Sequence, residues 1–94
     1  MNMEINPSEY KILIVDDVMS NVLLLKVLLT NEKFAIATAN NGQQALEQVD
    51  KEHPDLVLLD VMMPDLSGFE VAQRLKSNPD TADIPIIFLT ALNS

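Results

Sequence analysis

Three short apolar runs in this sequence are each followed by a side chain that carries oxygen. The runs cover residues 11–15, 56–59 and 84–89. The acidic pair Asp16 and Asp17 follows the first run, Asp60 follows the second, and Thr90 follows the third. Uninterrupted runs of this length are typical of strands that are covered on both faces of a parallel sheet. Because the carboxyl ends of parallel strands meet at one edge of the sheet, these side chains are predicted to share one crevice.

The remaining sequence alternates between helix and strand patterns. The predicted strands span residues 11–15, 34–39, 56–59 and 85–89. The predicted helices span about residues 18–31, 43–51 and 69–77. This alternation predicts a mostly parallel sheet with right-handed crossovers and helices on both faces. We expect a loose leader over residues 1–9 and a single domain over residues 10–94. The first predicted helix of this domain is apolar around much of its circumference.

Charge and composition exclude several kinds of partner. The formal net charge of −8 disfavours nucleic acid and anionic membranes as direct partners, and it fits a cation site. The sequence has no cysteine, which excludes disulfides and thiol chemistry and is compatible with the cytoplasmic location that we expect. Since no apolar run approaches the roughly 20 residues that cross a bilayer, no membrane segment is expected.

The acidic side chains at the strand ends predict a metal site. Three carboxylates within about 5 Å repel one another by a few kcal/mol per pair, so that either some are protonated or a hard divalent cation lies among them. Oxygen ligands favour Mg²⁺, or Mn²⁺, over zinc. With a hydroxyl from Thr90 and an amide N–H from Ala91, this set of groups suits phosphoryl transfer to Asp60. Capping of the following helix is the alternative role for Asp17 alone, and it stays open at this point.

Three segments carry a resemblance to a known family. They are residues 12–17, 54–68 and 85–91, in the family's order and spacing. Over residues 10–92 the sequence resembles the receiver domain of response regulators in two-component signalling. The resemblance implies a flavodoxin-like, doubly wound α/β fold with the strand order 2-1-3-4-5, of which 2-1-3-4 lies within this sequence.

The resemblance also implies roles in phosphoryl transfer. Asp60 matches the phosphoacceptor, which takes the group from the phosphohistidine of a sensor histidine kinase or a phosphotransfer protein. Thr90 matches the switch hydroxyl, and Ala91 matches the small residue whose N–H faces the phosphoryl group. The domain is expected to belong to a response regulator or a hybrid kinase and to be a signalling module, not an enzyme in the usual sense.

A metal site is implied at the same positions. Asp17 and Asp60 match direct Mg²⁺ ligands, Asp16 matches a residue that acts mostly through water, and Met62 matches the family's main-chain carbonyl ligand. Gly68 is expected to permit a conformation or a close approach that a Cβ atom would forbid.

The sequence departs from the family after its fourth strand. The family continues with a further helix, strand and helix, and the lysine that pairs with the phosphoryl group lies at the end of that further strand. We therefore expect a truncated receiver in which phosphorylation is impaired. The strand at 85–89 is expected to expose an open edge, through which the chain self-associates.

Two other functions are alternatives to this one. A phosphatase or mutase with an aspartyl-phosphate intermediate is disfavoured, because some such enzymes place a second aspartate where Met62 stands. An interaction module that is not phosphorylated is disfavoured by the intact acidic residues, although the missing lysine leaves that alternative open for this chain.

Overall fold

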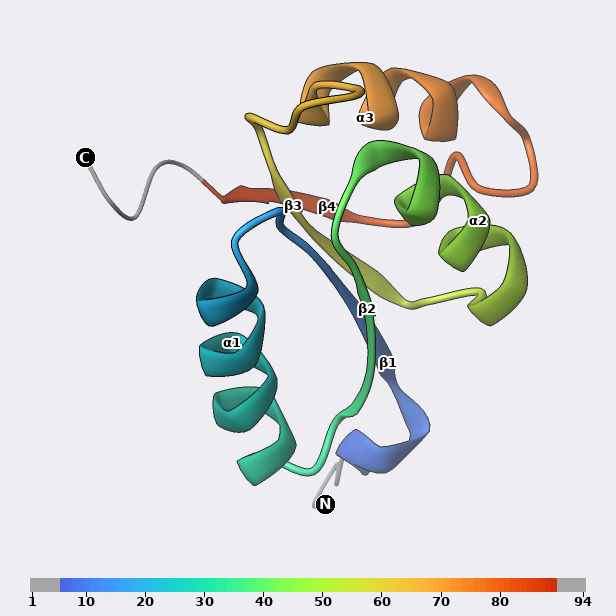
Figure 1. Cartoon of the computed structure of the whole chain (residues 1–94). Helices are drawn as coiled ribbons and strands as arrows, with labels where there is room; N and C mark the ends of the chain where they lie inside the picture. The colour runs from blue at the N-terminus through green and yellow to red at the C-terminus, as the bar shows by residue number, and fades with distance from the viewer. Residues whose placement is uncertain (1–5, 90–94) are drawn as a thin grey trace.

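A four-stranded parallel sheet forms the centre of the structure, a computed structural model that describes residues 6–89 (Figure 1). The elements in chain order are η1 (Pro7–Glu9), β1 (Lys11–Val15), α1 (Met19–Asn31), β2 (Ala35–Ala39), α2 (Gly42–Glu52), β3 (Leu56–Asp60), α3 (Gly68–Ser77) and β4 (Ile86–Leu89). The strands lie in the order β2-β1-β3-β4, and each neighbouring pair is parallel. This arrangement confirms the predicted doubly wound sheet and its strand order.

Helices cover both faces of the sheet, but unequally. Helix α1 lies on one face, and α2 and α3 lie on the other (Figure 1). Successive side chains of a strand point to opposite faces, so β1 sends Ile12 and Ile14 toward α1, and Leu13 and Val15 toward α2 and α3. This division explains why the strand sequence is apolar without interruption.

The two faces hold separate groups of buried side chains. The group on the α2/α3 face consists of Leu13, Val15, Ala39, Ala45, Val49, Val57, Leu59, Val71 and Leu75. The group on the α1 face consists of Ile12, Ile14, Val22 and Leu58. The larger group therefore lies between the sheet and the two later helices.

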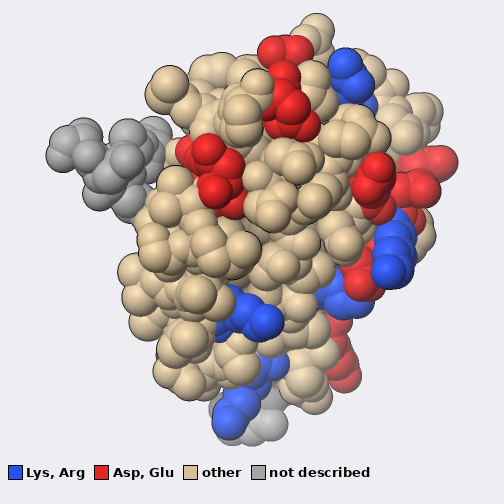
Figure 2. All heavy atoms as spheres, viewed as in Figure 1, with Lys and Arg blue, Asp and Glu red and all other residues tan. Residues whose placement is uncertain are grey.

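Helix α1 is apolar around much of its circumference, as its sequence predicts, and it exposes most of its apolar side chains. Val22 is its one buried residue, whereas its outward apolar side chains are 53–57% exposed: Met19, Leu23, Leu24, Val27 and Leu28. In Figure 2 the surface over α1 is mostly tan, and the acidic side chains lie mainly over other parts of this view. No helix within residues 6–89 has the length and apolar character needed to cross a membrane.

The element boundaries differ slightly from those predicted. Asp60 is the last residue of β3 instead of the residue after it. The predicted loose leader contains a short 3-10 helix at Pro7–Glu9, because the Asn6 side chain accepts a hydrogen bond from the Ser8 main-chain N–H and Pro7 occupies the first turn.

Candidate functional site

The carboxyl ends of β1 and β3 bring three aspartates together. Asp16 and Asp17 follow β1, and Asp60 ends β3. The two strands pair in parallel with Val15 opposite Leu59. Asp16 and Asp60, which come next in the sequence, therefore lie at the same level. One carboxylate oxygen from each of the three aspartates lies within 4.8 Å of the others. We refer to Asp16, Asp17 and Asp60 as the aspartate cluster; the sequence predicted this convergence.

Asp16 is the buried member of the aspartate cluster. It is 3% exposed, and both of its carboxylate oxygens accept hydrogen bonds. Oδ1 accepts from the Val18 main-chain N–H at 2.9 Å, and Oδ2 accepts from Asn21 Nδ2 at 3.1 Å. Val18 is the N-cap residue of α1 and makes no side-chain capping bond. Asp16, not Asp17, is therefore the carboxylate that accepts a main-chain N–H at the start of α1, and it also belongs to the cluster.

Asp60 has a perturbed proton affinity. Burial is the main reason that its pKa rises from 3.8 to about 6, and the negative charge of Asp16 adds to the rise. The Met62 main-chain N–H donates to Asp60 Oδ1 at 3.4 Å and opposes that rise. Asp60 is thus a partly exposed carboxyl group that holds a proton more tightly than an isolated aspartate does.

The aspartate cluster has the donor set of a hard divalent cation. Its ligand atoms are oxygens alone, which suit Mg²⁺ or Mn²⁺. Asp17 is exposed and Asp60 is partly exposed, whereas Asp16 already accepts one hydrogen bond on each oxygen. The carbonyl of Met62 follows Asp60 by two residues, and its role as a ligand stays a prediction.

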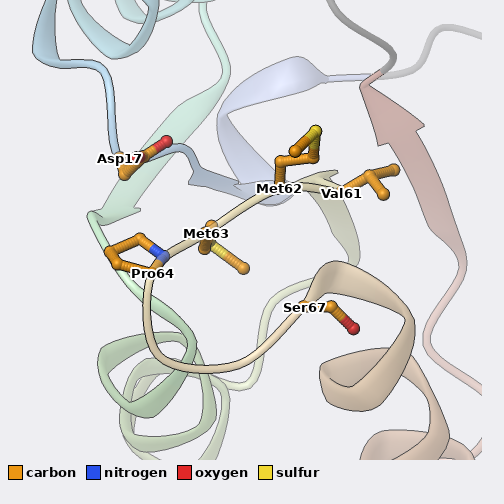
Figure 3. Close-up of a pocket in the computed structure, with 6 residues that line it drawn as sticks. All are labelled: Asp17, Val61, Met62, Met63, Pro64 and Ser67. Carbon is orange, nitrogen blue, oxygen red and sulfur yellow. The ribbon is translucent and has the colours of Figure 1, made fainter.

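An open hollow of about 530 Å³ adjoins the cluster. It is lined by Asp17, Val61, Met62, Met63, Pro64 and Ser67 (Figure 3). Met62 and Met63 leave the loop in opposite directions in this view. Met62 is 78% exposed, and Met63 packs against the buried group on the α2/α3 face. Asp17 thus belongs both to the cluster and to the wall of the hollow.

The loop between β3 and α3 is fixed at its end by Gly68. A Cβ atom at this position would lie 2.3 Å from the main-chain oxygen of Asp60 and 2.9 Å from the Cα atom of Val61. The Gly68 N–H donates to the Val61 oxygen at 2.8 Å. The start of α3 therefore lies directly against the backbone of the candidate phosphoacceptor, which is the close approach expected from the sequence.

The same loop is attached to α2 by Asp65. Its carboxylate accepts hydrogen bonds from the main-chain N–H groups of Gly42 at 2.8 Å and Gln43 at 2.9 Å. These two N–H groups, Gly42 first, hold the pKa of Asp65 below its usual range. Asp65 thus satisfies two of the free N–H groups of the first turn of α2, and Asn41 satisfies the next through Gln44.

Sequence reasoning did not identify Asn21 or Asp65 as residues that support the site. Val18 cannot cap α1 with its side chain, which signals that another acceptor lies at the helix start; that acceptor is Asp16, and no local pattern marks Asn21 as a donor to it. Thr90 and Ala91 lie outside the described residues, and their predicted roles stay predictions.

The sequence matches the family model of the response regulator receiver domain over residues 12–94. It is 46% identical over 83 residues to the response regulator PleD of Caulobacter vibrioides, an alignment that covers 88% of this chain and 18% of PleD. It is 48% identical over 90 residues to the probable transcriptional regulator ycf27 of Cyanophora paradoxa, covering 96% of this chain and 36% of that protein. The chain thus spans less than half the length of these relatives.

Solved structures show the same likeness. The N-terminal domain of a response regulator receiver protein from Methanoculleus marisnigri JR1 superposes with a TM-score of 0.85 and 41% identity, covering 87% of this chain and 67% of that chain. The response regulator TrrA of Thermotoga maritima, in complex with Mg²⁺-BeF, superposes with a TM-score of 0.81 and 42% identity, covering 89% of this chain and 71% of that chain.

Proposed function

The chain belongs to the response regulator receiver family, and we propose that Asp60 accepts a phosphoryl group in a Mg²⁺-dependent reaction. The observation that carries this proposal is the position of Asp60 at a strand end, within 4.8 Å of carboxylate oxygens of Asp16 and Asp17. A lone exposed carboxylate offers a nucleophile, but it offers no means of stabilising the charge on a phosphoryl group.

The proposed reaction transfers the phosphoryl group from a histidine nitrogen. A carboxylate oxygen of Asp60 attacks phosphorus, the bond between phosphorus and the imidazole nitrogen breaks, and the ring nitrogen keeps the electron pair. The products are an aspartyl phosphate and a free imidazole. A pKa of about 6 leaves most of Asp60 ionised at pH 7, which is the state that attacks.

The aspartate cluster fits the metal ion that this reaction needs. We propose Asp17 and Asp60 as ligands, with the main-chain carbonyl of Met62, and Asp16 acting through water. The two hydrogen bonds that Asp16 already accepts support the indirect role. When bound, Mg²⁺ neutralises the carboxylates and the charge of the transferred group. Thr90 and Ala91 are proposed as the hydroxyl and amide donors to that group.

The proposed donor is the phosphohistidine of a sensor histidine kinase or phosphotransfer protein. The hollow beside Asp17 and Met62 gives such a residue an approach to the cluster. The apolar atoms of Val61, Met62 and Met63 provide a surface for an imidazole ring. We propose a cytoplasmic location for this exchange, which the absence of cysteine from the sequence supports.

Incubation with acetyl phosphate and MgCl₂, followed by intact-mass spectrometry, tests the proposal. We expect a mass increase of one phosphoryl group that EDTA prevents and that Asp60→Asn abolishes. Phosphorylation that persists in Asp60→Asn at the wild-type rate would place the acceptor elsewhere and reject the assignment.

The pH dependence of uptake provides a second test. The raised pKa of Asp60 means that protons compete with Mg²⁺ and with phosphorus for the same oxygens below about pH 6. Uptake should therefore decline as the pH falls from 7 to 5, whereas a carboxyl group with the ordinary pKa of 3.8 would remain ionised over that range. The carbon chemical shift of the Asp60 carboxyl group in the metal-free chain measures the same pKa directly.

We also propose that this chain self-associates through the open edge of β4. Within residues 6–89, β4 pairs with β3 along one side only, and its residues Ile87 and Phe88 are 52% and 37% exposed. Unpaired strand edges with apolar side chains favour pairing with another chain. Light scattering during gel filtration should show a dimer at high concentration, and Ile87→Lys should shift it toward monomer. A wild-type chain that stays monomeric would contradict this proposal.

A further inference from the structure

We propose that Asn21 is a positioning residue, which orients the Asp16 carboxylate for metal binding. This inference rests on the proposed Mg²⁺ site, because the effect it predicts is on the affinity of the aspartate cluster for the ion. Asn21 lies in the first turn of α1 and forms no part of the cluster itself.

Two hydrogen bonds define the orientation of Asp16. Asn21 Nδ2 donates to Oδ2 at 3.1 Å, and the Val18 N–H donates to Oδ1 at 2.9 Å. With one donor on each oxygen, rotation of the carboxylate plane breaks at least one of the two bonds. The remaining lone pairs of both oxygens are thereby held in fixed directions with respect to Asp17 and Asp60.

Burial makes the Asn21 bond difficult to replace. Asp16 is 3% exposed, so water has little access to an oxygen that loses its protein donor. Without Asn21, the carboxylate keeps the Val18 bond alone and can rotate about it. If the Asp16 carboxylate must be reoriented before it can hold a water molecule of the ion, the site loses affinity, and removal of hydrogen bonds that support a metal site typically lowers metal affinity by about 10- to 100-fold.

The helix itself offers no better reason for an asparagine at this position. Asparagine is a poorer helix former than alanine or leucine, and it favours caps over helix interiors. Val18 is the N-cap of α1, so Asn21 occupies the third helical position. Its side-chain hydrogen bond to Asp16 gives the asparagine a role outside the helix.

Titration of the full chain with Mg²⁺ alone in a calorimeter tests the inference. Asn21→Ala should raise the Mg²⁺ dissociation constant by roughly tenfold. The matched control is Asn31→Ala, the same substitution at the exposed last residue of α1, which should leave the constant unchanged. Thermal unfolding in EDTA measures the effect of Asn21→Ala on stability alone. The dissociation constant is measured well below the unfolding transition. A lower melting temperature together with an unchanged dissociation constant would overturn the proposal.

A double-mutant cycle shows whether Asn21 acts through Asp16. In an Asp16→Ala background, Asn21→Ala should have no further effect on the Mg²⁺ dissociation constant. An undiminished tenfold effect in that background would reject the inference.

The proposed function can fail separately from this inference. A wild-type chain that binds no Mg²⁺ would overturn the metal site. The contact of Asn21 can then be tested in the metal-free chain by NMR. If the contact exists, the side-chain amide signals of Asn21 should shift in Asp16→Ala. Unchanged amide signals would overturn the Asn21 proposal, whatever the metal result.

Discussion

The two faces of the sheet use similar strand sequences with different results. On the α2/α3 face, nine residues within the described part of the chain form a closely packed buried group. On the α1 face, four residues do so, although α1 is richer in leucine than α2 or α3. Apolar side chains on α1 are thus mostly exposed. The apolar content of the helices therefore fails to indicate which face of the sheet is better packed. The number of helices that cover a face indicates this better.

Truncating one leucine on each side of the sheet tests that comparison and should give the largest effect on the free energy of unfolding. Leu59 is fully buried on the α2/α3 face, and Leu59→Ala should lower the free energy of unfolding by about 3 kcal/mol. Leu28 of α1 is 53% exposed, and Leu28→Ala should change it by less than about 0.5 kcal/mol. Urea denaturation at low protein concentration measures both. Equal losses would show that the outer surface of α1 is buried in solution.

Gly68→Ala should have the next largest effect. The added Cβ meets main-chain atoms of Asp60 and Val61, which cannot rotate away, so we expect a loss of about 2 kcal/mol. Gly42→Ala is the matched comparison, because its Cβ would come closer than 3.0 Å to one atom, the Leu66 Cβ at 2.6 Å, instead of two, and we expect a smaller loss. The same urea series measures both variants. A larger loss for Gly42→Ala would mean that α2 is packed more rigidly than the backbone around Asp60.

A smaller effect is expected at the helix starts, which differ between the two faces. The Asn41 side chain caps α2 by accepting from the Gln44 N–H at 2.8 Å, and Asn41→Ala should lower the free energy of unfolding by about 1 kcal/mol. Val18 caps α1 without a side-chain bond, so Val18→Ala should have a weaker effect. Thermal unfolding followed by circular dichroism compares them, and equal losses would refute the assigned difference in capping.

The smallest effect concerns the exposed carboxylate of Asp65. Its pKa is lowered in the folded chain, so its contribution is present above the unfolded value of 3.8 and is lost as the pH falls through the lower folded value. Asp65→Asn should therefore destabilise the chain at pH 7 and have less effect near pH 3. Asp83→Asn, at another exposed aspartate, is the control. A pH-independent difference between wild type and Asp65→Asn would argue against this linkage.

Local sequence patterns were sufficient to predict the sheet and the aspartate cluster. The apolar runs before Asp16 and Asp60 identify two buried parallel strands, and parallel pairing then brings their ends together without further information. The contacts of Asn21 and Asp65 could not be predicted in this way. Asp65 meets Gly42 across 23 residues, and that contact depends on the path of a loop which no periodic pattern describes.

Asp16 has a double role whose consequence can be measured. The carboxylate that belongs to the aspartate cluster also accepts the main-chain N–H of Val18 at the start of α1. A change in charge at the cluster therefore alters the electron density around one particular amide proton. The Val18 amide signal in a nitrogen–proton correlation spectrum is thus a natural reporter, which can register occupancy of the cluster without any attached label.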